Sequence, residues 1–422
     1  MAEESILTDD FLRELMNVGE VDILVGVPTH NDAKTVGQVV QAVRAGLLKH
    51  FPRQRAVIIN ADGGSRDATQ ELVRAASIND LQHETNFQSL RTLHSISTQY
   101  EGGHAEGRAL HILLAAADLL HPSACAVISP HSTSIEPDWV LRLLNPVCRE
   151  EFDYVTPVYR RHKFDGLLLR NLVYPMCRAL YSRQIWEPRP SDFSFSGKMA
   201  AHLFELDIWS GEPCRTGASL LTTIEAITGR FKMAQVFLGD IVRVDHNPAD
   251  LVEAMRNVLG PLFWSLEQNS AFWSSSNGSQ PVPIIGGAPE VTTEPLRINR
   301  KRLYHLFNQG VSELEPVLRS ILSGSTLAEL QRISKLPEEE FCFSNDLWTK
   351  TAYEFAASFH RAVISRDHVI QALAPLYRGK TFTFLQENHE ALPPEVERNV
   401  EALCLTFEQC KPELLPLWNG GK

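Results

Sequence analysis

The chain has 422 residues, which is longer than one hydrophobic core usually supports, so we expect two or three domains. Its 44% hydrophobic and 22% charged residues are typical of a soluble globular protein. A formal net charge of −11 argues against nucleic acid and anionic membrane surfaces as partners, because both require a basic protein face.

Three further features favour a cytoplasmic protein without a membrane span. The segment MAEESILTDDFLREL is acidic and lacks the basic-then-apolar order of a secretory signal. The longest apolar run, ALHILLAAADLL, contains His111 and Asp118 and is too short to cross a bilayer. None of the seven cysteines forms a Cys-x-x-Cys pair, so we expect neither structural zinc nor a disulfide framework, and a reducing compartment fits best.

The N-terminal part alternates strand and helix patterns. Short β-branched runs predict strands over 21–28, 54–62 and 124–129. Apolar residues at helical spacing predict helices over 33–51, 67–77 and 106–120. This alternation implies an α/β fold with a mainly parallel sheet covered on both faces. Ligands of such sheets bind at the carboxyl ends of the strands, so one edge should carry residues 28–32, 62–67 and 129–132.

The rest of the chain follows a different pattern. A middle region over 152–246 has mixed signals, and residues 269–296 are rich in Gly, Ser and Pro without any period. From 297 onward the pattern is helical. We therefore expect an α/β domain over 1–268, a linker or surface excursion over 269–296, and a helical C-terminal region over 297–422.

The stretch INADGGSRDAT (59–69) is the strongest local motif. A strand that ends in Asp62 and continues into Gly63 and Gly64 lets the backbone approach a ligand closely, and the aspartate can accept a hydrogen bond from a base or ribose. The alternative is a glycine-rich turn in which Asp67 caps the next helix and no ligand binds. If Asp62 lies at an open edge, Asp62→Ala should cost ligand affinity and little stability.

Together with VPTHNDAKTVGQVV (27–40), this motif resembles the nucleotide-binding half of a GT-A glycosyltransferase. The resemblance continues in GGHAEGRALHILLAAAD and STSIEPDWVLRLLNPV. The later segments YRRHKFDG and LTTIEAITGRFKMAQVFLGDIVRVDHNPADL look like acceptor-side segments of the retaining mannosylglycerate and glucosyl-3-phosphoglycerate synthases. The resemblance covers nearly the whole chain.

The resemblance implies a Rossmann-like GT-A fold and a hexosyltransferase. Such an enzyme moves a sugar, with retention, from a nucleotide-sugar donor to a small acidic acceptor of the glycerate kind. The nucleotide-binding residues that it implies are Pro28, Thr29, Asn31, Asp32, Asp62, Gly63 and Gly64. On the phosphate and acceptor side it implies Gly107, Arg160, Arg161, Gly197 and Lys198.

The residues that would neutralise the leaving diphosphate depart from the family pattern. In these enzymes an Asp-x-Asp pair holds a divalent cation, magnesium or manganese, and a lysine contacts the phosphates. Here the two aspartates fall on Ser129 and His131, and the lysine falls on Glu106. The acceptor-side acid falls near Ala218, and DFSFSGKM stands where the family has Gly-Gly-Glu.

One metal-linked position does match the family. His246 coincides with the histidine that completes the metal shell of the glucosyl-3-phosphoglycerate branch. His131 and His246 are therefore candidate metal ligands, although two imidazoles suit zinc, manganese or cobalt better than magnesium. The alternative is that both are ordinary polar histidines and that no metal binds.

Other side chains are candidates to supply the missing charges. The basic cluster at 160–163 either faces the diphosphate directly or lies in a solvated loop. The missing carboxylates are supplied from elsewhere or are absent, and the candidates are Asp138, Asp192, Glu212 and Asp245. The helical tail either packs as a core, which its aromatic spacing favours, or covers the acceptor pocket or forms a homodimer face.

Two functions follow from these observations. The first is a working sugar-nucleotide transferase, and the second is a degenerate relative that binds a partner or regulates it. The coordinated changes at Ser129, His131, Glu106 and Ala218 favour the second, whereas the retained nucleotide edge favours the first, which we prefer. A dinucleotide-dependent oxidoreductase is not expected, because no Gly-x-Gly-x-x-Gly follows the first strand.

Overall fold

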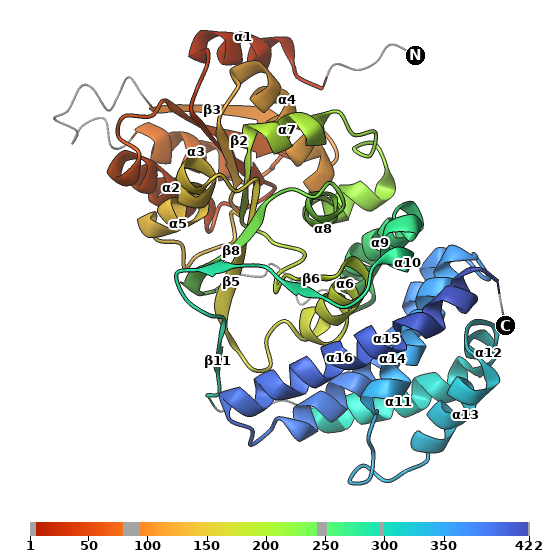
Figure 1. Ribbon diagram of the computed structural model, residues 1–422. Coiled ribbons are helices and arrows are strands. Elements are labelled where there is room, and N and C mark those ends of the chain that lie inside the picture. Colours follow the sequence, from red (N-terminus) through yellow and green to blue (C-terminus); the bar gives the residue numbers. More distant parts are fainter. Residues whose placement is uncertain (1–5, 79–92, 243–250, 295–298, 421–422) are drawn as a thin grey trace. The chain divides into compact units, whose positions relative to one another are not determined.

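The computed structural model describes residues 6–78, 93–242, 251–294 and 299–420 (Figure 1). The chain divides into two compact units. The first comprises Met1–Tyr159, Glu187–Pro248 and Val282–Pro289, and the second comprises Arg160–Trp186, Ala249–Pro281 and Glu290–Lys422. No helix among the described residues is both long and apolar enough to cross a membrane. Whether the chain folds with boundaries at 268 and 296 stays a prediction.

Eight strands of the first unit's sheet follow the spatial order β10-β8-β5-β7-β4-β1-β2-β3. In chain order the described strands are β1 (Ile23–Thr29), β2 (Ala56–Asp62), β3 (Leu93–Gln99), β4 (Ala124–Val127), β5 (Tyr154–His162), β7 (Phe193–Ser196), β8 (Met233–Asp240) and β10 (Ile284–Ile285). The neighbours β4, β1, β2 and β3 are parallel, and β7 is antiparallel to both β4 and β5. The mainly parallel sheet predicted from the alternating pattern is therefore confirmed.

Helices cover both faces of this sheet. One face buries β-branched and aliphatic side chains of β1, β2 and β4 against α2 (Val36–His50), α3 (Thr69–Ile78) and α5 (Pro137–Glu150). The other face packs against α4 (Glu106–Leu120), which in turn contacts α1 (Asp9–Val18), α7 (Gly197–Phe204) and α8 (Glu212–Thr228). Gly26 of β1 allows this close approach, because a Cβ atom there would lie 2.3 Å from Leu113 Cδ1.

The parallel register sets which residues meet at the carboxyl edge. Thr29, the last residue of β1, lies opposite Asp62, the last residue of β2. Gly26 of β1 lies opposite Val127 of β4, so the turn that starts at Ser129 follows on the same edge. The sheet therefore brings together the three strand ends that the sequence placed along one edge.

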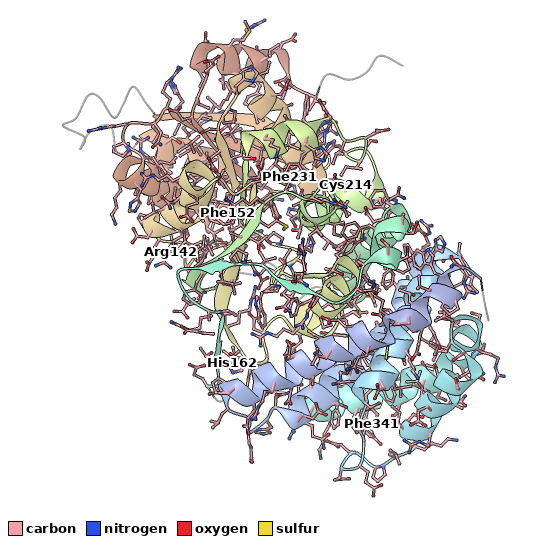
Figure 2. All side chains as sticks on the ribbon, in the orientation of Figure 1. Arg142, Phe152, His162, Cys214, Phe231 and Phe341 are labelled. Carbon is pink, nitrogen blue, oxygen red and sulfur yellow. The ribbon has the colours of Figure 1, made fainter. Side chains whose placement is uncertain are left out.

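The second unit is mainly helical, as predicted for the C-terminal region. Its helices are α6 (Tyr174–Tyr181), α9 (Leu251–Gln268), α10 (Ser270–Ser275), α11 (Arg300–Glu313), α12 (Glu315–Ile321), α13 (Gly324–Ile333), α14 (Asn345–His360), α15 (Arg366–Glu387) and α16 (Pro393–Trp418), with a π-helix at Leu169–Val173. Short strands β6 (Arg183–Gln184) and β9 (Gln280–Pro281) pair with each other, and β11 (Glu290–Thr292) pairs with Arg160–His162 of β5. Phe341 (Figure 2) packs against the rings of Phe307 and Phe382 at centroid distances of 5.0 and 5.4 Å.

Candidate functional site

Asp62 is buried, and other residues of the chain donate hydrogen bonds to it. Its carboxylate is 0% exposed and accepts five hydrogen bonds. The donors are the Thr29 hydroxyl (2.9 Å), the Ser65 amide and hydroxyl (2.9 and 2.5 Å), and the side-chain amides of Gln70 and Gln99 (2.9 and 3.2 Å). A carboxylate offers about four lone-pair sites, so the acceptor capacity of Asp62 is filled. The expectation of an open edge at Asp62 is wrong.

The electrostatics of Asp62 follow from these contacts. Burial opposes ionisation, but hydrogen bonds from Ser65, Gln70 and Thr29 outweigh it and hold the pKa below its usual value. The residue is therefore a buried, ionised anchor for the turn after β2. A nucleobase would reach its oxygens only by displacing one of the five donors.

Asn31 and Asp32 are also tied into the fold. Asn31 has a φ of 59°, a left-handed conformation that asparagine tolerates, and its side-chain oxygen accepts from the Arg66 amide at 2.9 Å. Asp32 is 1% exposed, accepts from the His30 amide at 2.8 Å, and lies 3.2 Å from His131 Nδ1. The polar atoms of the predicted nucleotide edge thus bridge the ends of β1, β2 and β4.

The two positions after β2 favour glycine for different structural reasons. Gly64 has a φ of +77°, which favours glycine, and a Cβ atom on Gly63 would lie 2.2 Å from the Gly103 carbonyl oxygen. The loop that contains Gly103 follows β3 and lies directly on Gly63. The close backbone approach expected here therefore occurs between two segments of this chain.

The turn at Ser129–Ser132 stands where the family resemblance would place an Asp-x-Asp pair. Buried Asp192 holds this turn, accepting from the Ser129 amide at 2.9 Å and from the Ser132 hydroxyl at 3.0 and 3.1 Å. The Tyr159 hydroxyl also donates to Asp192, at 2.8 Å. Asp192 therefore lies behind the turn and supports it, while His131, whose side chain is 28% exposed, lies over Asp32.

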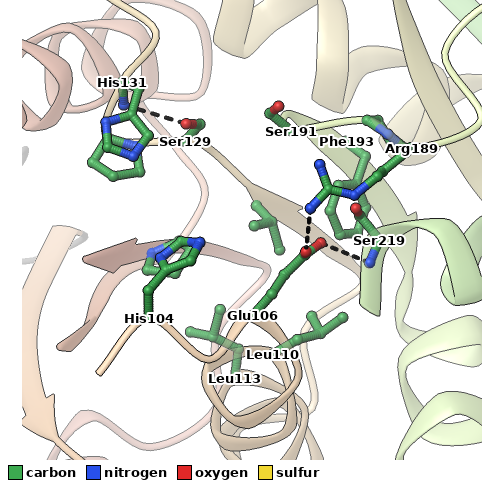
Figure 3. Close-up of a pocket in the computed structure, with 14 residues that line it drawn as sticks. His104, Glu106, Leu110, Leu113, Ser129, His131, Arg189, Ser191, Phe193 and Ser219 are labelled. Atoms are coloured by element: carbon green, nitrogen blue, oxygen red, sulfur yellow. Dashed lines mark hydrogen bonds and ion pairs between the residues drawn. The ribbon is translucent and has the colours of Figure 1, made fainter. Parts of the chain in front are cut away.

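A pocket of about 180 Å³ lies beside this turn (Figure 3). Its polar lining comes from four segments of the first unit and consists of His104, Glu106, Ser129, His131, Arg189, Ser191 and Ser219, with Pro28 among the apolar residues. Glu106, the first residue of α4, accepts from the Ser219 amide at 2.8 Å and pairs with Arg189 Nη2 at 3.2 Å. A cation therefore does face this pocket, although it is Arg189 and not a residue at position 106.

The described residues beside this turn offer few ligands for a divalent metal. Among the described residues, no group of three or more His, Cys, Asp or Glu side chains could hold an ion. Ser129 offers only a hydroxyl, and Nδ1 of His131 lies on Asp32. His246 lies outside the described residues, as does Asp245. Of the other candidate carboxylates, Asp138 pairs with Lys49 and His50 at 2.8 Å, and Glu212 is exposed beside Arg215.

The predicted phosphate- and acceptor-side residues are dispersed. Gly107 is buried in α4, where a Cβ atom would lie 2.5 Å from the Cys214 carbonyl oxygen, so it serves close helix packing. Gly197 donates its amide to Ser123, at the amino end of β4 and away from the pocket. Its neighbour Lys198 is exposed and lies 3.7 Å from Asp153. None of these three residues lines the pocket.

The basic cluster at 160–163 belongs to the second unit and its charges have internal partners. Arg160 pairs with Glu290 at 2.6 Å and Arg161 pairs with Asp165 at 2.9 Å. Lys163 is buried and donates to the His389 and Ala391 carbonyl oxygens at 2.8 and 3.3 Å. These contacts give the cluster a structural role in that unit, and contact with a diphosphate stays a prediction.

Sequence reasoning missed Arg189 and His104. Arg189 lies 83 residues after its partner Glu106, so no local pattern links the two. The available signal was the reversed charge at position 106, since a carboxylate at a helix start beside a buried sheet edge needs a nearby cation or amide donor.

Comparisons with known proteins give matches among solved structures alone. No family model and no curated protein matches the chain. Among solved structures, the chain is similar to Mycobacterium tuberculosis glucosyl-3-phosphoglycerate synthase in complex with Mg²⁺ and uridine diphosphate, at 18% identity and a TM-score of 0.45 over 64% of this chain and 84% of that one. The complex of that enzyme with Mn²⁺, uridine diphosphate and phosphoglyceric acid is 17% identical, with a TM-score of 0.44 over 64% of this chain and 84% of that one. These matches fall in the group that the sequence motifs resemble, and at this identity they assign neither activity nor ligand.

Proposed function

We propose that this protein is a glycosyltransferase of the GT-A type that uses a nucleotide-sugar donor. The finer proposal is hexosyl transfer, with retention, to a small acidic acceptor of the glycerate kind. Two features support it: the family-like motifs at 27–40 and 59–69, and a pocket at the carboxyl edge of a mainly parallel sheet, where such folds bind ligands. The observation that carries the proposal is a permanent cation, Arg189, lining that pocket.

The chemistry proposed for the pocket requires no metal step. Negative charge grows on the leaving diphosphate as the bond to the sugar breaks, and donors already in place stabilise it without reorganisation. Arg189 supplies charge, and His104 and His131 supply ring nitrogens. Asp32, close to His131 Nδ1, acts as a positioning residue that orients the imidazole.

The test is donor binding and turnover with a matched arginine control. UDP-glucose and GDP-mannose are titrated by calorimetry into wild type, Arg189→Gln and Arg142→Gln, and turnover is followed with glycerate and phosphoglycerate as acceptors. Arg142 lies on α5, is exposed and donates to the Phe237 carbonyl oxygen at 3.1 Å (Figure 2). We expect Arg189→Gln to lose at least tenfold in affinity or rate, which corresponds to about 1.4 kcal/mol for a charged hydrogen bond, and Arg142→Gln to match wild type. Equal behaviour of the two variants would contradict the proposal.

A second function is favoured by one specific observation. Asp62, the residue expected to accept from the base or ribose, is 0% exposed and has its acceptor capacity filled internally. This arrangement suits a degenerate relative that keeps the fold and acts as a binding or regulatory partner. Absence of binding for every nucleotide sugar, with a folded protein, would favour this second function over the first.

Location and assembly belong to the same proposal. The seven cysteines all lie among the described residues and are free thiols, which fits a reducing compartment such as the cytoplasm. A homodimer through the helical tail is proposed as well, and sedimentation of the full chain at several concentrations tests it.

A further inference from the structure

His30 joins three loops at the candidate site. Its Nδ1 lies 3.1 Å from the Gly63 carbonyl oxygen, in the turn after β2, and its Nε2 lies 3.0 Å from Nδ2 of Asn31. Gly103, in the loop after β3, also lies against the ring, since a Cβ atom there would be 3.6 Å from Nε2. The next residue, His104, lines the pocket (Figure 3). The imidazole therefore connects the turns after β1 and β2 with the loop that brings His104 to the pocket.

The hydrogen bonds around His30 permit one tautomer of its ring. Asn31 Oδ1 accepts from the Arg66 amide at 2.9 Å, so the atom of Asn31 that faces His30 is Nδ2, which can only donate. Nε2 of His30 is then the acceptor, which places the proton on Nδ1, and Nδ1 donates to the Gly63 carbonyl oxygen. Only a neutral ring satisfies these contacts together, because both nitrogens of an imidazolium are donors.

A second proton on His30 conflicts with this arrangement. An N–H group at Nε2 would face the Nδ2 donor of Asn31 across 3.0 Å. Rotation of the Asn31 amide would offer an oxygen to Nε2, but the Arg66 amide would then lose its acceptor. Protonation of the ring therefore costs one hydrogen bond in either case.

The carboxylates near His30 accept from other donors. Asp62 accepts the five hydrogen bonds described above, and Asp67 accepts from the amide and the hydroxyl of Thr69. Asp32 accepts from the His30 backbone amide at 2.8 Å. The other titratable or charged side chains on the segments that meet here are Lys34, Arg66, Tyr100, Glu101, His104 and His131. Because histidines in general change charge between about pH 5 and 8, a test at His30 must be separated from the two histidines in this list.

We propose that His30 is a proton-sensitive positioning residue of the candidate site. The neutral ring holds the loop of Gly103 and His104 against the turn after β2. In acid the ring takes a second proton, loses its contact with Asn31 and loosens the loop that brings His104 to the pocket. The inference rests on the proposed function only for its effect on donor binding, because the change in the fold requires no ligand.

Urea denaturation of the full chain between about pH 8 and 5 tests the change in the fold. His30→Asn keeps a donor nitrogen near the place of Nδ1 and cannot take a second proton. As pH falls, we expect the folding equilibrium constant of wild type to decrease roughly two- to tenfold more than that of His30→Asn, which corresponds to one lost hydrogen bond. The control is His121→Asn, which should follow wild type. His121 is exposed at the end of α4 with a φ of 50°, which asparagine tolerates.

Asn31→Asp gives a result that a merely structural role of His30 would not produce. Its second carboxylate oxygen replaces the Nδ2 donor and accepts from a protonated Nε2, and aspartate also tolerates the φ of 59° at this position. Relative to the double variant that also carries His30→Asn, the stability of Asn31→Asp should rise as pH falls. Wild type relative to His30→Asn should show the opposite sign. Parallel curves in both pairs, or the same sign in both, would overturn the inference.

Calorimetric titration with UDP-glucose at about pH 8 and 5.5 extends the test to the pocket. Donor affinity should fall at least threefold more in wild type than in His30→Asn between these two values, and an equal fall in both would overturn the inference. Parallel stability curves with normal donor binding would overturn the inference and leave the proposed function in place. The expected stability curves without any donor binding would support the inference and contradict the proposed function.

Discussion

Replacing Asp62 with alanine tests whether this carboxylate is a structural anchor. The change removes the acceptor of five hydrogen bonds from a site that is 0% exposed. Gln99 is exposed and Gln70 is half-buried, so both can turn to water. The Thr29 hydroxyl and the Ser65 amide are held by the fold and lose their acceptor. At about 1–3 kcal/mol for each of these two stranded donors, we expect a loss of roughly 2–6 kcal/mol in the free energy of unfolding.

Urea denaturation without nucleotide measures this loss, with Asp138→Ala as the control. Asp138 is a partly exposed carboxylate of the first unit that pairs with Lys49 and His50, and its loss should change stability far less. Because the pKa of folded Asp62 is held below its ordinary 3.8, its contribution is present above that pH and lost as pH falls through the folded value. The difference in stability between the two proteins should therefore narrow as pH falls below 3.8. Wild-type stability of Asp62→Ala at neutral pH, with loss of nucleotide affinity alone, would refute this reasoning.

Three further changes test other parts of the structure. Gly63→Ala should destabilise the folded protein by roughly 1–3 kcal/mol, because its Cβ would lie 2.2 Å from the Gly103 carbonyl oxygen. As the control, Gly37→Ala in α2 meets no atom within 4 Å and should be neutral or stabilising. Equal urea midpoints for the two variants would contradict this. Burial lowers the pKa of Lys380 to about 8, so above that pH the folded state binds fewer protons than the unfolded state. The stability of wild type relative to Lys380→Met should therefore rise by on the order of 3 kcal/mol between about pH 7 and 10.5. Parallel curves of stability against pH for the two proteins in urea denaturation would show the reasoning wrong. Chelation of divalent cations, or addition of manganese, should leave the melting temperature unchanged, and a manganese-dependent rise that His131→Ala abolishes would contradict the metal-free pocket.

The elements of the first unit were predictable where periodicity is strong. β1, β2 and α4 fall within a few residues of their predicted ranges, because buried parallel strands are apolar runs and α4 is apolar at helical spacing. β3, Leu93–Gln99, carries no such signal, since LHSISTQ alternates only weakly and lies at the end of the sheet beside β2 alone. The division into two units was also not readable, because each unit is assembled from separate stretches of the chain.

The sequence predicted where the site lies on the sheet but not which side chains contact one another there. Parallel pairing follows from topology, so the meeting of Thr29 with Asp62 could be expected. The donors to Asp62 could not, because the Gln99 amide comes from a strand 37 residues away that the sequence did not predict. Likewise, Glu106 stands where the family has a lysine, so the sequence indicated only that a cation was missing there. Its partner Arg189 is evident only in the structure, because the fold brings α4 beside the segment before β7.

The most direct measurement is a crystal structure of the protein soaked with UDP-glucose and manganese. Our account predicts phosphate density beside Arg189 and His131, no metal at the Ser129 turn, and an Asp62 carboxylate still bonded to Thr29 and Ser65. A uracil or ribose bonded to Asp62 after release of those donors, or a manganese ion between the Ser129 turn and the diphosphate, would contradict it.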